Sequence, residues 1–247
     1  MRVKEIMRSE FPGMWKNVRL IRNAINRIRK PVVFGELSNH ALSERMGLDR
    51  GQAIDRWYIE RFLETHKKYV KGDLLEIADS QYSKKYAHGE SRYHILTFDK
   101  EAYNKDGKVI YGDLTDKSTL IPEVADCFIC TQTLNFIFDV KKAVHGVRYL
   151  LKNGGVALVT VAGISQISPF DYERWGDFWR FTDQSIRRLF EDEFGKDNIK
   201  VQIYGNLVSC MAYLQGLCVE DLPDIRMLEK KNNYYQCIIG IMARKIE

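Results

Sequence analysis

The stretch Lys71–Tyr86, KGDLLEIADSQYSKKY, decides the fold of this 247-residue chain. Its apolar run, LLEI at residues 74–77, predicts a short buried parallel strand. The acidic Glu76 and the small-residue turn Ala78–Ser80 follow, and a polar segment with helical character begins at Ser83. A strand, a tight turn and a helix in this order are typical of a site for a nucleotide-like cofactor. Backbone N–H groups of such a turn can approach the ligand, and the acidic side chain can hold a cationic amine.

Outward from this stretch, strand and helix signals alternate. The predicted helices are Ala53–Tyr69, Ala143–Leu151 (stopped by Asn153, Gly154 and Gly155), Thr182–Phe194 with Thr182 or Asp183 as N-cap, and Leu207–Leu217. The further predicted strands are Tyr93–Phe98, Lys108–Tyr111, Asp126–Thr133, Val156–Val161, Ile199–Tyr204 and Gln236–Ala243. Short apolar strands separated by helices predict a doubly wound α/β fold, in which helices cover both faces of a seven-stranded, mostly parallel sheet.

The N-terminal part has a different composition, so we expect residues 1–50 to form a helical, basic extension and residues 51–247 to form the main domain. Met1–Lys30 carries only two acids, Glu5 and Glu10, and its apolar residues recur with loose helical periodicity. One interpretation is a basic amphipathic helix that touches a membrane surface or an anionic partner. The other, which we favour, is a helix packed on its own domain or on a subunit partner, for example in a homodimer.

Composition sets the remaining limits. The formal net charge of +5 suits an anionic substrate. No signal peptide opens the chain and no apolar run approaches the roughly 20 residues that span a bilayer, so we expect a cytoplasmic protein. Cys127 and Cys130 form a C-x-x-C pair inside an apolar run, where positions i and i+3 point to opposite strand faces, which predicts buried reduced thiols. The five histidines show no metal-ligand spacing, so no metal is expected.

Polar residues that follow the predicted strands mark the expected ligand edge, since ligands of open parallel sheets bind at the carboxyl ends of the strands. Asp99, after the second strand, is placed to accept the hydroxyls of a ribose. Asp113, after the third, is placed to accept from the exocyclic amine of an adenine. Thr131, Gln132, Thr133 and Asn135 lie around the end of the fourth.

The loop Gly163–Thr182 is dense in polar and aromatic residues directly after a buried strand. Trp and Tyr faces stack on sugar rings, Arg binds phosphate bidentately, and a carboxylate can deprotonate a hydroxyl. Asp177, between two tryptophans, is our first candidate for a catalytic base and Asp171 our second. The alternative is a loop held together by its own Trp–Arg and Asp–Arg contacts, with no ligand.

Several segments together resemble the class I S-adenosylmethionine (SAM)-dependent methyltransferases of the methyltransferase type 11-like kind. The matching pieces are LLEIADSQY, VIYGDLTD, ADCFICTQTLNFIFD and YLLKNGGVALVTVAG. The resemblance implies a Rossmann-like fold and SAM as cofactor, with S-adenosylhomocysteine as product. The residues that it implies for the cofactor are Glu76, Ile77, Ala78, Asp79, Ser80, Tyr82, Asp99, Asp113, Leu114, Thr131 and Gln132.

The first motif departs from the family pattern, because Ala78 and Ser80 stand where the family usually has glycines. We expect this turn to stay near ordinary dihedral angles. The same departure argues against NAD or FAD, whose pyrophosphate needs a G-x-G-x-x-G turn.

A second, narrower resemblance concerns GLDRGQAIDRWYIERFL together with GISQISPFDYERWGDFWRFT, which are similar to a subgroup found with bacterial glycosyltransferases and surface polysaccharide loci. It implies O-methylation of a sugar or of a phosphoryl or phosphoramidate group in capsule or lipopolysaccharide biosynthesis. The acceptor, a small molecule or glycan and anionic, would meet Gln166, Tyr172, Trp175, Trp179 and Arg180. Two rivals stay open: an inactive SAM-fold scaffold of a glycan assembly complex, and a nucleic-acid methyltransferase. No recognisable nucleic-acid-binding module supports the latter, so no nucleic acid is expected.

Overall fold

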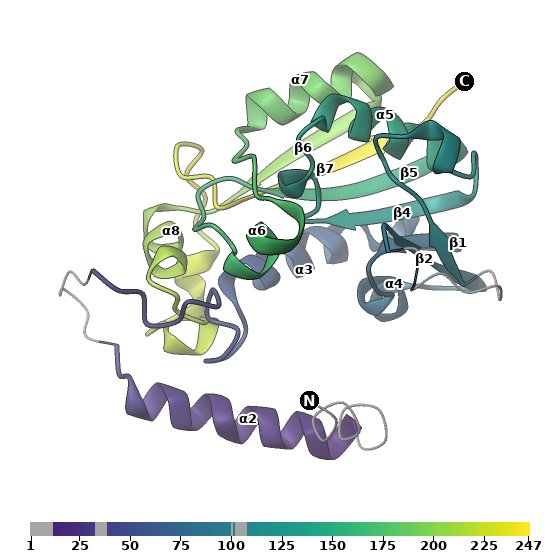
Figure 1. Ribbon diagram of the computed structural model, residues 1–247. Coiled ribbons are helices and arrows are strands. Elements are labelled where there is room, and N and C mark those ends of the chain that lie inside the picture. Colours follow the sequence, from purple (N-terminus) through teal and green to yellow (C-terminus); the bar gives the residue numbers. More distant parts are fainter. Residues whose placement is uncertain (1–11, 33–38, 100, 102–107) are drawn as a thin grey trace.

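The computed structural model describes residues 12–32, 39–99, 101 and 108–247, and these form a single seven-stranded sheet with flanking helices (Figure 1). The sheet order is β3-β2-β1-β4-β5-β7-β6, in which β7 alone runs antiparallel to its neighbours. The strands are β1 Gly72–Ile77, β2 Ser91–Thr97, β3 Val109–Tyr111, β4 Ala125–Thr131, β5 Leu151–Ala162, β6 Ile199–Tyr204 and β7 Ile238–Arg244. This confirms the predicted doubly wound, mostly parallel sheet.

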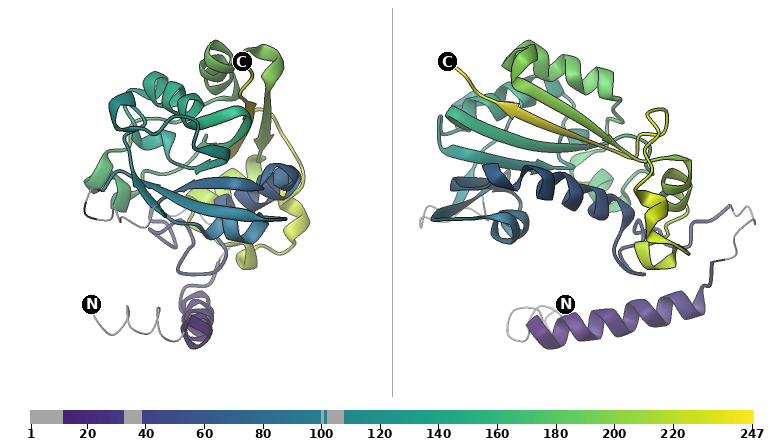
Figure 2. Two further views of the ribbon diagram at one scale, coloured as in Figure 1. Left: turned by 90° about the vertical axis from the view of Figure 1, so that its right-hand side faces the viewer. Right: turned by 180° about the vertical axis from the view of Figure 1, so that it is seen from behind.

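Helices cover both faces of the sheet (Figures 1 and 2). On one face lie α5 (Val140–Leu150) and α7 (Asp183–Phe194), and on the other lie α3 (Ile54–His66), α4 (Gln81–Tyr86) and α8 (Leu207–Leu214). A short helix, α6 (Pro169–Trp175), lies in the segment between β5 and α7. Thr182 caps α7 as predicted, because its side chain accepts from the backbone N–H of Ser185 in a capping box.

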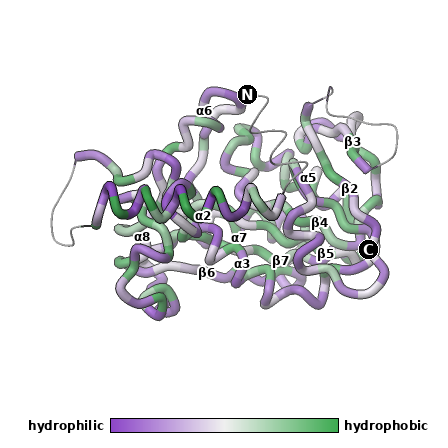
Figure 3. Tube along the Cα trace, turned by 90° about the horizontal axis from the view of Figure 1, so that it is seen from below, coloured by the Kyte–Doolittle hydropathy of each residue, from purple (hydrophilic) through white to green (hydrophobic). Residues whose placement is uncertain are grey.

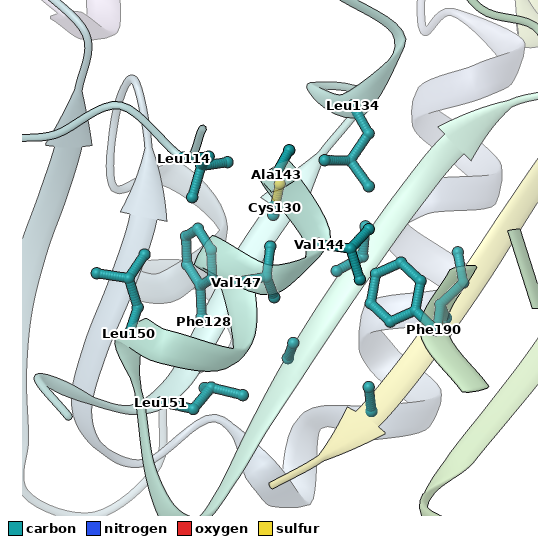
Figure 4. Packing of buried hydrophobic residues seen from close by; sticks show 14 of the residues in the cluster. Leu114, Phe128, Cys130, Leu134, Ala143, Val144, Val147, Leu150, Leu151 and Phe190 are labelled. Carbon is teal, nitrogen blue, oxygen red and sulfur yellow. The ribbon is translucent and has the colours of Figure 1, made fainter. Parts of the chain in front are cut away.

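Two hydrophobic clusters fill the space between the sheet and its helices. The first joins Phe128 and Cys130 of β4 to α5 and α7 (Figure 4). The second joins Cys127 and Ile129 of the same strand to α3 and α8. The alternation along β4 therefore places Cys127 and Cys130 on opposite faces, as predicted, and both thiols are free and buried. Burial raises the pKa of Cys130 to about 12, so this thiol stays protonated at neutral pH.

The strand β5 begins earlier than predicted. We expected Asn153–Gly155 to separate a helix from a strand at Val156, but β5 starts at Leu151 and runs through these residues. Its pairing with β4 shifts register between Ala125 and Cys127, and this irregularity accommodates the glycine pair inside the strand.

At the amino end of the sheet, a charged network joins four strands. Asp73 of β1 accepts a hydrogen bond from Arg92 of β2 at 2.5 Å and another from Lys152 of β5 at 2.5 Å. Lys152 also donates to Asp126 of β4 at 2.9 Å. The hydrogen bond from Arg92 holds the pKa of the Asp73 carboxyl well below its usual range.

The helix α2 (Pro12–Arg29) lies beside the body of the molecule and is joined to it by few contacts (Figure 2). Asn23 is its one buried residue. Its apolar side chains Met14, Val18, Ile21 and Ile28 are exposed, which contradicts the interpretation that this helix packs its apolar face on its own domain. The first eleven residues of the predicted N-terminal extension lie outside the described residues, and so do residues 33–38. Among the helices that the structure describes, none is long and apolar enough to cross a membrane.

Candidate functional site

The strand order reverses between β1 and β4, since β2 and β3 follow on one side and β5 on the other. The carboxyl ends of β1 and β4 border this switch point, the place where open α/β sheets bind ligands. Ala78, directly after β1, has φ of 69°, and Gln132, directly after β4, has φ of 51°. Both residues therefore lie in the left-handed region, which costs a non-glycine residue of the order of 1–2 kcal/mol. The expectation of ordinary dihedral angles in the first turn was wrong, because Ala78 adopts the conformation that a glycine would adopt there.

Glu76 holds this turn against the end of β1 through hydrogen bonds to the start of α4. Its side chain is buried, and its two carboxylate oxygens accept from the backbone N–H groups of Tyr82 at 3.1 Å and Ser83 at 2.7 Å. Burial raises the pKa of Glu76, while these two hydrogen bonds act in the opposite direction. The carboxylate thus satisfies the first N–H groups of α4 and fixes the helix to the end of β1, which is a different role from the predicted contact with a ligand amine.

The other residues predicted for the cofactor divide into exposed and buried ones. Asp79 and Asp99 are exposed, at the ends of β1 and β2. Asp113 is half-buried after β3, where its Oδ1 atom accepts from the backbone N–H and the hydroxyl of Thr115. The remaining ones are more enclosed: Ser80, Tyr82 and Leu114 are buried, and Ile77 and Thr131 are half-buried.

Tyr82 points away from the turn. Its ring packs in the cluster beneath α3, and its hydroxyl accepts from Arg56 at 3.3 Å. Burial raises the pKa of this phenol. Tyr82 therefore supports the packing of α4 against α3.

The 163–182 loop runs from the end of β5 over this edge of the sheet (Figure 1). Arg180 organises it. Its guanidinium makes five hydrogen bonds, to both oxygens of Asp177 and to the carbonyl oxygens of Ser165, Gln166 and Trp179. Since a guanidinium has five N–H donors, none remains for the phosphate fork that we predicted for Arg180.

Asp177 is equally engaged. Its side chain is only 1% exposed, and besides Arg180 it accepts from the backbone N–H of Ser168 at 3.2 Å. A carboxylate in this position holds the loop together, as the ligand-free alternative for the loop predicted. The geometry therefore favours a positioning role for Asp177 over that of general base.

Asn135 ties the loop to the ends of β4 and β5. Its backbone carbonyl oxygen accepts from the backbone N–H groups of Phe178 and Trp179. Its side-chain amide nitrogen donates to the backbone carbonyl oxygen of Trp179 at 3.0 Å. Its Oδ1 atom accepts from the N–H of Ala162 at the end of β5. The indole N–H of Trp179 is also used, toward the carbonyl oxygens of Ile137 and Phe138. Trp179 thus anchors the loop.

The helix α6 presents the more accessible side chains. Tyr172 and Trp175 are exposed, and the Trp175 ring lies edge-on to Phe98, with centroids 6.2 Å apart. Asp171 is half-buried and accepts from the Ser168 hydroxyl at 2.6 Å. Gln166 instead turns its amide toward the carbonyl of Glu44, at 3.0 Å.

One residue of this edge was missed by the sequence analysis. Phe98 is exposed beside Asp99, between the rings of Tyr111 and Trp175. The sequence feature that could have identified Phe98 is its position directly before Asp99, the acid at the end of the second predicted strand. Asn135 was among the polar residues expected around the end of the fourth strand, and its amide is used within the protein, since a buried amide needs several hydrogen-bond partners.

Other candidate sites are weaker. Two surface depressions lie at the end of β6, two strands beyond β5, and include Tyr204 in one and Asn206 in the other. Neither touches the switch point. Among the residues that the structure describes, no group of three or more His, Cys, Asp or Glu side chains could hold a metal.

Comparison with known proteins identifies the fold. No family model and no curated protein matches this chain. Among solved structures, the SeMet-substituted CurJ carbon methyltransferase matches with a TM-score of 0.51 at 15% identity, over 100% of this chain and 71% of that one. This is a class I methyltransferase fold.

Two further neighbours are SAM-dependent methyltransferases. The one from Mesorhizobium loti has a TM-score of 0.49 at 11% identity, over 78% of this chain and 98% of that chain. The one from Archaeoglobus fulgidus has a TM-score of 0.48 at 10% identity, over 77% and 94%. The narrower resemblance to a polysaccharide-locus subgroup gains no support from these structures.

Proposed function

We propose that this protein is a SAM-dependent methyltransferase that binds its cofactor at the switch point between β1 and β4. The observation that carries the proposal is the pair of left-handed, non-glycine residues there, Ala78 and Gln132. Strained backbone persists where the surrounding structure enforces it, and it concentrates at ligand sites. A fold alone hosts many activities, so the proposal rests on this site and not on the fold.

The residues around the switch point fit SAM in their chemistry. The exposed carboxylate of Asp99, on the strand next to β1, can accept from ribose hydroxyls. Asp113 has its Oδ1 atom fixed by Thr115, which orients the carboxyl group for an adenine amine. Glu76 acts indirectly, by fixing the turn Ala78–Ser80 to the start of α4.

When bound, SAM supplies an already activated methyl group, so the chain's own contribution is chiefly to position the acceptor. The exposed rings of Tyr172 and Trp175 offer faces on which a sugar or another planar group can stack. The full use of Arg180 inside the loop removes the residue on which a phosphate-binding fork depended. We therefore propose a hydroxyl acceptor, a small molecule or glycan, in place of a phosphoryl group.

For a neutral hydroxyl a base is needed, and Asp171 is the better candidate. It lies on α6 beside Tyr172 and keeps one carboxylate oxygen outside the hydrogen bond from Ser168, whereas Arg180 holds both oxygens of Asp177. The base would take the hydroxyl proton as the acceptor oxygen attacks the methyl group.

The deciding experiment is isothermal titration calorimetry with SAM and S-adenosylhomocysteine. A methyltransferase binds both, and the Asp99→Ala variant binds both more weakly. An inactive scaffold with this fold binds neither, and that result would refute the proposal. Transfer of label from [methyl-14C]SAM to a panel of nucleotide sugars then tests the acceptor class. A strongly salt-dependent affinity for mixed oligonucleotides would favour a nucleic-acid acceptor instead.

A further inference from the structure

Polar residues on one side of the helix α2 make hydrogen bonds to the body of the molecule. The Asn26 amide donates to the carbonyl oxygen of Asp49 at 2.8 Å, and the Arg27 guanidinium donates to the carbonyl of Arg50 at 2.5 Å. Asn23, the one buried residue of the helix, lies on the same side. These contacts fix which face of α2 points toward the protein.

The opposite face of α2 is apolar and open. It consists of five side chains spaced four, three, four and three residues apart, a spacing that aligns them on one side of a helix. Their exposed fractions range from 41% to 79%. They are Met14, Val18, Ile21, Ile25 and Ile28. Figure 3 shows α2 in front of the body, with hydrophobic and hydrophilic residues alternating along it. Nothing in the described part of the chain covers this stripe.

The charge of α2 indicates what covers it. The helix contains five basic residues and no acidic one. Arg22 and Arg29 follow Val18 and Ile25 by four residues, so they border the apolar stripe. An apolar face bordered by arginines, on a helix too polar to span a bilayer, is the pattern of helices that lie in the interface of an anionic membrane.

A second copy of the chain suits this stripe less well. Pairing two α2 helices would bring ten positive charges together without an acid on either helix to offset them. The stripe also covers about two heptads, fewer than the three or four that sustain a coiled coil.

We propose that α2 is a membrane-interface helix that holds this protein on anionic lipid, with its apolar stripe inserted and Arg22 and Arg29 at the headgroups. The proposal is independent of the methyltransferase proposal, because it uses no residue of the switch point.

The test is co-sedimentation of the full chain with vesicles of phosphatidylcholine, with and without phosphatidylglycerol. We expect binding to the anionic vesicles and little to the neutral ones. The paired change Ile21→Ser with Ile28→Ser should abolish binding. The matched control, Leu207→Ser with Leu214→Ser, removes two exposed apolar residues with the same spacing from α8 and should bind like wild type. Arg22→Gln with Arg29→Gln should weaken binding by on the order of tenfold to thirtyfold.

Circular dichroism of each variant confirms that it is folded. Three results would overturn the proposal. One is the absence of binding to anionic vesicles, and another is equal binding to neutral ones. The third is a wild-type dimer in sedimentation velocity that the Ile21→Ser, Ile28→Ser variant loses, which would assign the stripe to a second copy.

Discussion

Arg180 donates to both carboxylate oxygens of Asp177, from Nη1 to Oδ1 at 2.5 Å and from Nη2 to Oδ2 at 2.9 Å. This bidentate pair closes the 163–182 loop on itself, and the loop in turn lies over the proposed cofactor site. The first two predictions concern what each acid of this loop does.

Asp177→Asn should lower the free energy of unfolding by roughly 1–3 kcal/mol, because an amide has one acceptor oxygen in place of two and its NH2 group faces a donor of Arg180 that is left unpaired. With the loop loosened, the KM for the acceptor should rise while cofactor affinity stays the same. Denaturant titration and calorimetry with S-adenosylhomocysteine measure the two effects. An unchanged stability would mean that the pair does not hold the loop.

Asp171→Asn is the matched variant in the same loop. If Asp171 is the base, kcat should fall by ~10²–10⁴-fold with stability nearly unchanged, since proton transfer by a positioned group contributes about that much. Comparison of the two variants separates catalysis from positioning. Full activity of Asp171→Asn, together with a pH–rate profile that is flat where carboxylates titrate, would indicate an acceptor oxygen that is already anionic.

Ala78→Gly should stabilise the protein by about 0.5–1 kcal/mol. The relief of left-handed strain at Ala78 exceeds the extra entropy that glycine loses on folding. The control is Ala87→Gly, because Ala87 has an ordinary φ of −59° and gains no such relief, so that variant should be destabilised. Urea titrations of the two variants give the comparison. If both variants lose stability equally, the turn does not have the left-handed conformation.

Asp113→Ala should weaken the binding of S-adenosylhomocysteine by roughly 1–3 kcal/mol, through the loss of a hydrogen-bonded acceptor. Asp116→Ala is its control, since Asp116 caps the next turn by accepting from Ser118 and is exposed. Calorimetry should find only the first variant impaired. Equal affinities would remove Asp113 from the cofactor site.

The network at Asp73 predicts a pH dependence of stability. Its folded-state pKa is depressed below the unfolded value of about 3.9, so the stabilisation is present above that value and is lost as the pH falls through the folded-state pKa. The gap in unfolding free energy between wild type and Asp73→Asn should stay constant from pH 7 to about 5 and shrink in more acidic solution. If the difference in unfolding free energy between wild type and Asp73→Asn instead widens on acidification, the pKa of Asp73 is raised and not lowered in the folded protein.

Most of the fold could be predicted because it depends on local patterns. The apolar runs at β1, β4 and β6 and the N-cap at Thr182 each carry their signal within a few residues. The start of β5 could not be predicted, because Gly154 and Gly155 are typical of a turn and only their pairing beside β4 keeps them in a strand. The interpretation that α2 packs its apolar face on its own domain was wrong for a related reason, since periodicity identifies an apolar face but not whether another element covers it.

The location of the site could be predicted from the sequence, but most contacts of its individual side chains could not. The sequence located the strand-end residues, because strand ends follow from strand assignment. It could not determine the partners of individual side chains. Glu76, Tyr82 and Arg180 are of residue types that suit a ligand, yet each is taken up by groups of the protein. Arg56, the partner of Tyr82, comes from a segment that only the folded chain brings close. Asp177 is near Arg180 in the sequence, and its contact with Arg180 was the alternative considered for that loop.

Asn135 has a consequence for how two ligands would bind. Its side chain and carbonyl join the 163–182 loop to the end of β5, directly beside β4 and the switch point. A ligand under the loop and one at the switch point would therefore share the same mechanical link. By thermodynamic linkage, if the first ligand changes the affinity for the second by some factor, the second changes the affinity for the first by the same factor. A methyltransferase built this way would show heterotropic cooperativity, and Asn135→Ala, which removes the side-chain bonds to Trp179 and Ala162, would weaken it.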